Sequence, residues 1–209
     1  MKLSAAIAIG GSALAASQAA QAGREPFGIM ALRPDSSLQF AKVGASQGYI
    51  LINLRDDDAV CEIKPWDKVP SQATFYINDG VLYLYTNKEY STDKTKVQRL
   101  FVDLSDAGQG RLGYHRLADI IPDYCEVNGW KVDKTGNLSF NGNELIACPV
   151  PNKGSWTIWA GNATATPGGN KGCLGFSART IPSNKPVPCE YSLFPDRIPS
   201  HPWGRDGPS

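Results

Sequence analysis

The chain has 209 residues and a formal net charge of +1 at pH 7, from 21 basic and 20 acidic residues. This balance produces no long-range positive field, which argues against a partner that is a nucleic acid or an anionic membrane surface. Hydrophobic residues make up 42% of the chain and charged residues 20%, a composition that excludes intrinsic disorder. The length is enough for one well-packed domain or two small ones.

The first 22 residues have the pattern of a signal peptide. Lys2 precedes a run of small and apolar residues over 3–16, and Ala20-Gln21-Ala22 forms a small-x-small cleavage site before Gly23. The apolar run is shorter than the ~20 residues of a membrane-spanning helix. We therefore expect export, removal of residues 1–22 and no membrane insertion.

Short apolar runs separated by turn residues follow, with the period of two that is typical of antiparallel strands. The clearest unit is a hairpin over 73–85, in which Asp79-Gly80 supplies the turn. A second unit over 129–148 has turns at Thr135-Gly136 and Asn141-Gly142, and we expect it to form a meander. The other predicted strands are 27–33, 38–43, 49–54, 98–104, 111–116, 156–160, 174–181 and 190–193.

These segments predict a single all-β domain over 23–193, an antiparallel barrel or sandwich of about 10–12 strands. Phe27, Phe75 and Trp130 each open an aromatic strand, at intervals of 48 and 55 residues, so a three-fold β-trefoil remains open. Residues 194–209 contain four prolines, and we expect a flexible tail.

The five cysteines are Cys61, Cys125, Cys148, Cys173 and Cys189. In an oxidising compartment they predict two disulfides and one unpaired thiol, but spacing alone does not select among the 15 arrangements. We expect no metal site and no cofactor. Asn137 and Asn162 begin glycosylation sequons, and Asn162 is the better candidate because a Gly/Thr/Pro-rich segment surrounds it.

Candidate catalytic residues are few. Of the two histidines, His201 lies in the expected tail, and His115 has no nucleophile motif in the chain to act on. We interpret His115 as an ordinary structural histidine and expect no catalytic residue.

The carboxylates also show no pairing of the kind that glycosidases use. Asp79 belongs to a turn, Asp103 is placed to hold the turn that follows it, and Glu144 starts a strand. The run Asp56-Asp57-Asp58 could bind calcium but fits a solvated turn better. The glycines over 108–113 fit turns rather than a phosphate loop.

The chain has five tryptophans and eight tyrosines, and exposed rings can stack on sugars. Phe75, Trp130 and Trp156 alternate with polar residues and are predicted to lie in the core. Trp66 and Tyr90 lie in polar segments and are the better candidates for exposed contacts.

Several segments in order resemble the fungal PhiA-type (phialide-associated) cell wall proteins. They are Phe27-Gly-Ile29, residues 73–85, Leu100-Phe-Val-Asp103, residues 108–114, Gly129-Trp130, residues 145–149 and Trp156-Thr-Ile-Trp159. The resemblance spans about 26–192. It implies a non-enzymatic, secreted, wall-associated protein linked to asexual sporulation. The alternatives are a module that binds wall polysaccharide and a small secreted hydrolase.

A more distant similarity, to the C-terminal domain of yeast wall proteins with internal repeats, concerns the cysteines. Its Gly-Trp, Gly-Asn-Leu, Cys and Cys follow in the order of Gly129-Trp130, residues 136–138, Cys148 and Cys173. It implies a Cys148–Cys173 bridge, with Cys61–Cys189 as the second. The chain departs from the PhiA pattern in lacking a cysteine near the mature N-terminus, in having Cys125, and in the segments 87–96 and 194–209.

Overall fold

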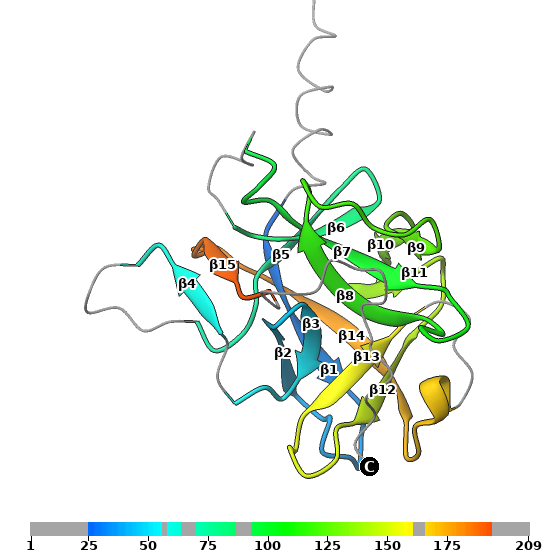
Figure 1. The fold of residues 1–209 in the computed structure, drawn as a ribbon. Coiled ribbons are helices and arrows are strands. Elements are labelled where there is room, and N and C mark those ends of the chain that lie inside the picture. The colour runs from blue at the N-terminus through cyan, green and yellow to red at the C-terminus, as the bar shows by residue number, and fades with distance from the viewer. Residues whose placement is uncertain (1–24, 56–57, 64–69, 87–92, 161–165, 194–209) are drawn as a thin grey trace, which may run out of the picture.

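The computed structural model describes residues 25–55, 58–63, 70–86, 93–160 and 166–193. Within them lie fifteen strands and one short 3-10 helix, Pro167–Gly169. The strands form a 13-stranded antiparallel sheet and a separate pair, β4 and β15 (Figure 1). The predicted all-β fold is confirmed. The predicted signal peptide and tail lie outside the described residues and stay predictions.

The strands fall close to the predicted segments. Their bounds are β1 (Phe27–Leu32), β2 (Ala41–Ser46), β3 (Tyr49–Ile52), β4 (Ala59–Cys61), β5 (Phe75–Asn78), β6 (Val81–Leu84), β7 (Gln98–Asp103), β8 (Arg111–Arg116), β9 (Cys125–Glu126), β10 (Trp130–Val132), β11 (Asn137–Phe140), β12 (Leu145–Pro149), β13 (Trp156–Trp159), β14 (Leu174–Pro182) and β15 (Cys189–Tyr191). Strands β4 and β9, of three and two residues, were not predicted.

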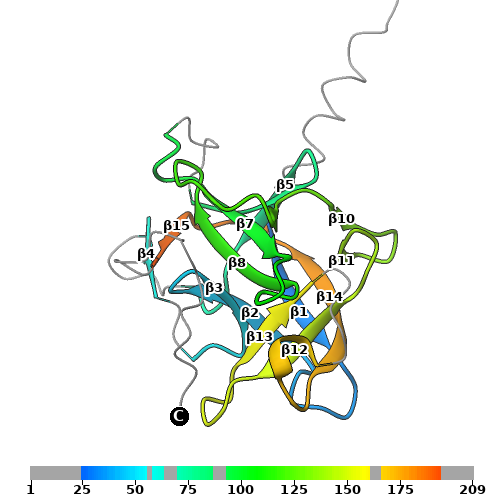
Figure 2. The ribbon, with the colours of Figure 1, turned by 45° about the vertical axis from the view of Figure 1, so that its right-hand side comes forward.

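The large sheet curls on itself. Strand β14 pairs with β1 over six residues, from Phe27 opposite Pro182 to Leu32 opposite Ser177, and also pairs with β12. Neighbouring strands therefore follow one another as β1, β2, β3, β13, β12 and β14, and β14 returns to β1 (Figure 2). The side chains that face inward from this arrangement form one core.

The core follows a period of two in β3, β6 and β11, whereas successive residues are buried in β7 and β8. Its largest fully buried apolar side chains are Trp130, Phe75, Phe140, Leu38, Ile50, Ile52, Leu82, Leu84, Leu100, Leu145 and Ile158. Burial of a side chain of this size contributes about 2–3 kcal/mol of transfer free energy. Trp130 packs against Phe140 with ring centroids 5.0 Å apart. The prediction that Phe75 and Trp130 belong to the core agrees with their burial, and Trp156 packs against the core from a half-buried position.

The predicted meander over 129–148 is only partly correct. Strands β10 and β11 form a hairpin, but both β11 and β12 pair with β14, which stands between them in the order of the sheet. The partner of β12 is thus a strand from the C-terminal end of the chain. Turn signals report the local reversal at Asn141-Gly142 and carry no information on this distant pairing.

The pairings also do not repeat three times. The strands that begin at Phe27, Phe75 and Trp130 are β1, β5 and β10. Strand β1 pairs with β2, β5 and β14, β5 pairs with β1 and β6, and β10 pairs with β11. The three aromatic strands therefore occupy different positions in the sheet, and their even spacing does not reflect a repeated unit.

Candidate functional site

A groove of about 540 Å³ opens where the start of β1, the β5–β6 turn, β10 and the end of β14 meet. Its apolar lining comes from Pro26, Phe27, Ile77, Trp130, Val132 and Pro182. Its polar lining comes from Glu25, Asp79, Lys131 and Thr180. A concave surface with a mostly apolar lining and a few polar groups is the usual form of a ligand site, and its volume is within the usual range of ~300–1,000 Å³.

Two glycine-containing turns shape the groove. Asp79 and Gly80 have φ values of 50° and 78°, the left-handed pair that a two-residue hairpin turn requires. The carbonyl oxygen of Gly80 accepts hydrogen bonds from the amides of Gly129 (3.1 Å) and Trp130 (3.0 Å), which fixes β10 against the turn. Gly129 has a φ of 113°, and a Cβ there would lie 2.1 Å from Oδ1 of Asn141. Only glycine therefore fits before Trp130.

The groove brings together accessible and buried groups. Val132 is 41% exposed, and Glu25, Asp79 and Lys131 are also exposed. Trp130 is only 1% exposed, and its Nε1–H is buried without a hydrogen-bond partner in the part of the chain that the structure describes. A buried donor in this state costs about 1–3 kcal/mol, and a ligand oxygen could accept from it only after the side chains that cover it move.

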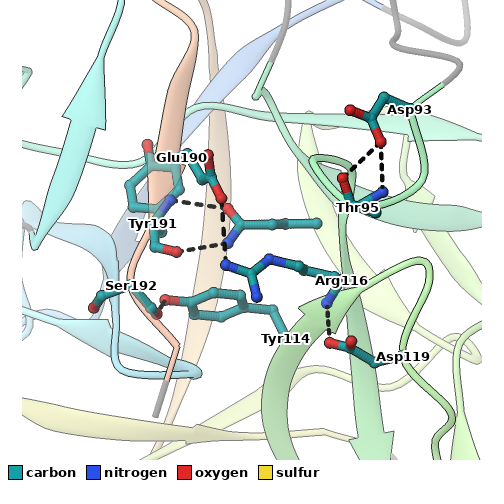
Figure 3. Close-up of polar contacts among 9 residues, drawn as sticks. Asp93, Thr95, Tyr114, Arg116, Asp119, Glu190, Tyr191 and Ser192 are labelled. Atoms are coloured by element: carbon teal, nitrogen blue, oxygen red, sulfur yellow. Dashed lines mark hydrogen bonds and ion pairs between the residues drawn. The ribbon is translucent and has the colours of Figure 1, made fainter. Parts of the chain in front are cut away.

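The C-terminal strand is held to the domain by polar contacts that come from β7 and β8 (Figure 3). The fully buried Gln98 amide donates from Nε2 to the carbonyl oxygen of Tyr191 (2.6 Å) and accepts at Oε1 from the amide of Tyr191 (2.9 Å). The side chain thus satisfies both backbone groups of Tyr191, as a neighbouring strand would. The hydroxyl of Tyr114 donates to the carbonyl oxygen of Ser192.

A half-exposed ion pair adds to these contacts. Arg116 and Glu190 lie 3.4 Å apart, and both side chains are more than 40% exposed (Figure 3). Solvent screening limits such a pair to well below 1 kcal/mol. Among these polar side-chain contacts, the buried hydrogen bonds of Gln98 therefore contribute most to the attachment of β15.

His115 is buried in the sheet between Arg99 and Phe101. Its Nε2 accepts a hydrogen bond from Nε of Arg99 (3.2 Å), and its ring meets the ring of Phe101 edge-on at 5.7 Å. Burial and, second, the charge of Arg99 lower the pKa of His115 to about 4, against a weaker opposing effect of Asp119. A neutral ring with its acceptor nitrogen already engaged is a structural histidine rather than a general base.

This environment predicts a pH-dependent stability. The unfolded His115 binds a proton near pH 6.5, whereas the folded one binds it only near pH 4, so acidification across this interval favours unfolding. We expect His115 to account for a loss of about 3 kcal/mol between pH 7 and pH 4. Urea unfolding at both pH values should show a smaller loss for His115→Gln, which keeps an acceptor for Arg99. Equal losses in the two proteins would contradict this account.

The carboxylates that sequence analysis singled out lie on separate elements. Asp79 is in the groove turn and Glu144 is exposed between β11 and β12. Asp103 is buried at the end of β7, where it accepts a hydrogen bond from the amide of Ser105 (3.0 Å). A Cβ on Gly108 would lie 2.1 Å from Cγ of Asp103, so the glycine-rich run makes room for this carboxylate. Asp103 therefore stabilises the turn that follows it.

The structure contains two disulfides, Cys61–Cys189 and Cys148–Cys173. The more distant similarity to yeast wall proteins implied Cys148–Cys173 first and Cys61–Cys189 as the second choice. Cys61 and Cys189 stand opposite each other in β4 and β15, and their bridge closes 128 residues of chain. Cys125 is the free cysteine among the described residues, and burial, with a smaller contribution from Asp103, raises the pKa of its thiol to about 12. At neutral pH this thiol is protonated and weakly nucleophilic.

The remaining candidates are mostly outside the described residues. These include Asn162, Trp66, Tyr90, His201, Asp56 and Asp57. Asn137 is described: its Nδ2 donates to Oγ1 of Thr135, and its Oδ1 accepts from Nε of Arg179, both at 3.0 Å. Glycosylation at Asn137 and Asn162 stays a prediction. In the part of the chain that is described, no group of three metal-binding side chains occurs, and no helix is long and apolar enough to cross a membrane.

The comparisons with known proteins agree on one family. The family described as PhiA-like secreted protein matches residues 27–192. The chain belongs to the PhiA-like secreted protein family. A protein of Arthroderma benhamiae named cell wall protein phiA is 47% identical over 154 residues, which cover 73% of this chain and 80% of that protein.

Two further relatives with the same name come from Aspergillus niger and Emericella nidulans. Each is 39% identical, over 181 and 193 residues respectively. The alignments cover 87% and 92% of this chain, and 92% and 100% of those proteins. No solved structure matches.

The sequence pointed to part of the groove. Asp79-Gly80 and Gly129-Trp130 were both singled out, as a turn and as a family motif. Pro26, Val132, Lys131 and Thr180 were not, because each is an unremarkable residue of its own strand or strand end. Only the pairing of β1 with β14, and of the Gly80 turn with β10, brings them to one place.

Proposed function

We propose that this protein is a non-enzymatic component of the fungal cell wall that acts in asexual development, in the formation of phialides and conidia. The observation that carries the proposal is its similarity, across most of the chain, to proteins named cell wall protein phiA. The developmental part rests on the resemblance to phialide-associated proteins. Wall polysaccharide or other wall components are the expected partners.

The fold supports this function because several contacts restrain its C-terminal strand from local unfolding. One disulfide ties β15 to β4, 128 residues earlier in the chain, and the buried Gln98 ties β15 to β7. Extracellular proteases cut segments that unfold locally, so a C-terminal strand held at several points protects the chain. Such a domain is suited to a long lifetime outside the cell.

The non-enzymatic part is supported by the candidate residues that the sequence offered. His115 is neutral, buried and hydrogen-bonded to Arg99, and Asp103 is buried against the glycine turn. Among the described residues neither is placed as a nucleophile–base pair or as two facing carboxylates would be. A polysaccharide-binding activity needs none of these groups.

The proposal can be tested by deletion and complementation in the fungus that carries the gene. We expect deletion to reduce the number of phialides and conidia, and the wild-type gene to restore them. The double variant His115→Gln/Glu144→Gln should restore them equally well, because neither side chain acts chemically. Full sporulation of the deletion strain would contradict the developmental role. Failure of a correctly folded and secreted double variant would contradict the non-enzymatic role.

A further inference from the structure

We propose that the groove between β1, the β5–β6 turn, β10 and β14 binds a polysaccharide chain of neutral pyranose sugars. The inference rests on the proposed function, since it names the wall component that the protein contacts. It is carried by the mixed lining of the groove, by the unsatisfied Nε1–H of Trp130 and by the charges at the rim.

A pyranose ring has an apolar face of C–H groups and an equator of hydroxyl groups. The groove offers partners for both. Pro26, Val132 and Pro182 present accessible apolar surface, while Glu25 and Asp79 supply carboxylate oxygens that accept hydrogen bonds from hydroxyls. A purely apolar ligand would cover these exposed carboxylates and displace their water without supplying hydrogen bonds, so the lining favours an amphipathic, hydroxyl-rich ligand.

Donors for the sugar oxygens are present as well. Lys131 contributes an exposed ammonium group, and Trp130, which lines the groove, contributes a buried indole N–H that has no partner among the described residues. Buried polar groups in folded proteins are normally hydrogen-bonded, so an unsatisfied one at a groove calls for an explanation. A ring or hydroxyl oxygen of a bound sugar would supply the missing acceptor.

The charges select against other polymers. Two carboxylates and one ammonium line the groove, which gives it a slight negative charge. A polyanion would be repelled by Glu25 and Asp79 and would have only Lys131 to pair with. Neutral glucan and N-acetylated chitin chains share the chemistry that the groove fits, and the experiment distinguishes these two sources.

The test uses the ¹⁵N-labelled mature protein and two probes, a β-1,3-glucan hexasaccharide and a chitin hexasaccharide. The indole N–H signal of Trp130, assigned with Trp130→Phe, should shift on titration with at least one probe. Val132→Phe places a large ring in the groove and should weaken binding by about tenfold or more. The matched control Val60→Phe makes the same change at an exposed position of β4 and should bind like the wild type.

A shift with the glucan alone, with chitin alone, or with both identifies the source and supports the inference. No shift at millimolar concentrations of either probe would overturn it, as would equal binding by Val132→Phe and Val60→Phe. The binding proposal and the proposed wall function can fail independently. A protein that stays in the wall but binds neither probe contradicts only the proposal that the groove binds polysaccharide. A protein absent from the wall refutes the proposed function whatever the groove binds.

Discussion

Replacing Cys61 and Cys189 together with alanine is expected to lower the free energy of unfolding by about 5 kcal/mol. A disulfide restricts the unfolded chain, and in the chain-entropy model the effect grows with the loop that it closes. The Cys61–Cys189 bridge closes 128 residues, whereas Cys148–Cys173 closes 25. The same model gives about 3.5 kcal/mol for the shorter loop. The first variant should therefore be the less stable of the two.

The local structure adds to this difference. Strands β4 and β15 have three residues each and form a two-stranded sheet of their own. A pair this short is not stable in isolation, so the covalent link between its opposite residues keeps β4 in place. Because domains are commonly stable by only about 5–15 kcal/mol, the loss would be a large part of the total.

Urea unfolding of the two double variants measures this difference directly. Cys125→Ala serves as the control, since it removes the free thiol and leaves both bridges intact. If Cys61→Ala/Cys189→Ala does not accumulate, a second comparison applies. Cys148→Ala/Cys173→Ala, which keeps the Cys61–Cys189 bridge, should retain more structure than the fully reduced wild-type protein. Equal or greater stability of the Cys61→Ala/Cys189→Ala variant would refute the prediction.

The second large effect is expected at Gln98. Replacing Gln98 with leucine keeps the approximate volume but removes the two buried hydrogen bonds that its side chain makes to the amide and the carbonyl of Tyr191. Each unsatisfied buried group costs about 1–3 kcal/mol, so we expect a loss of about 3–4 kcal/mol. The matched change Gln39→Leu removes one exposed hydrogen bond, to the amide of Arg33, and should cost less than about 1 kcal/mol.

Hydrogen exchange separates this explanation from general destabilisation. In Gln98→Leu the amide of Tyr191 should exchange much faster than in the wild type. The exchange rates of amides in β1 and β14 should change only as far as the global free energy of unfolding changes. Unchanged protection of Tyr191 relative to those strands would show that Gln98 does not hold β15.

The sequence predicted local structure well because short-range chemistry decides it. The Asp79-Gly80 hairpin formed with the expected strands, since two left-handed residues are needed there and these residues provide them. The strand at 111–116 has the bounds expected from its pattern. Periodicity likewise placed Phe75 and Trp130 in the core.

Long-range pairing was not predictable in the same way. Gln98 was expected only as the first residue of a strand, and nothing near it indicates that its amide serves Tyr191, 93 residues later. Strand β14 begins some 30 residues after β11 and β12, and no local pattern indicates that it lies between them in the sheet. The groove shares this property, because it is built by β1, the β5–β6 turn, β10 and β14, which lie far apart in the sequence. Periodicity reports which face of a strand is buried but not which strand lies beside it.

The central claim is that the folded domain resides in the cell wall. The measurement that tests it most directly is quantitative immunoblotting of epitope-tagged protein in medium, cytosol and purified wall fractions of sporulating cultures. We predict that most of the protein is in the wall fraction, with its leader removed and both disulfides intact in a non-reducing peptide map. Recovery of most of it from the cytosol, or from the medium with none bound to the wall, would contradict the account.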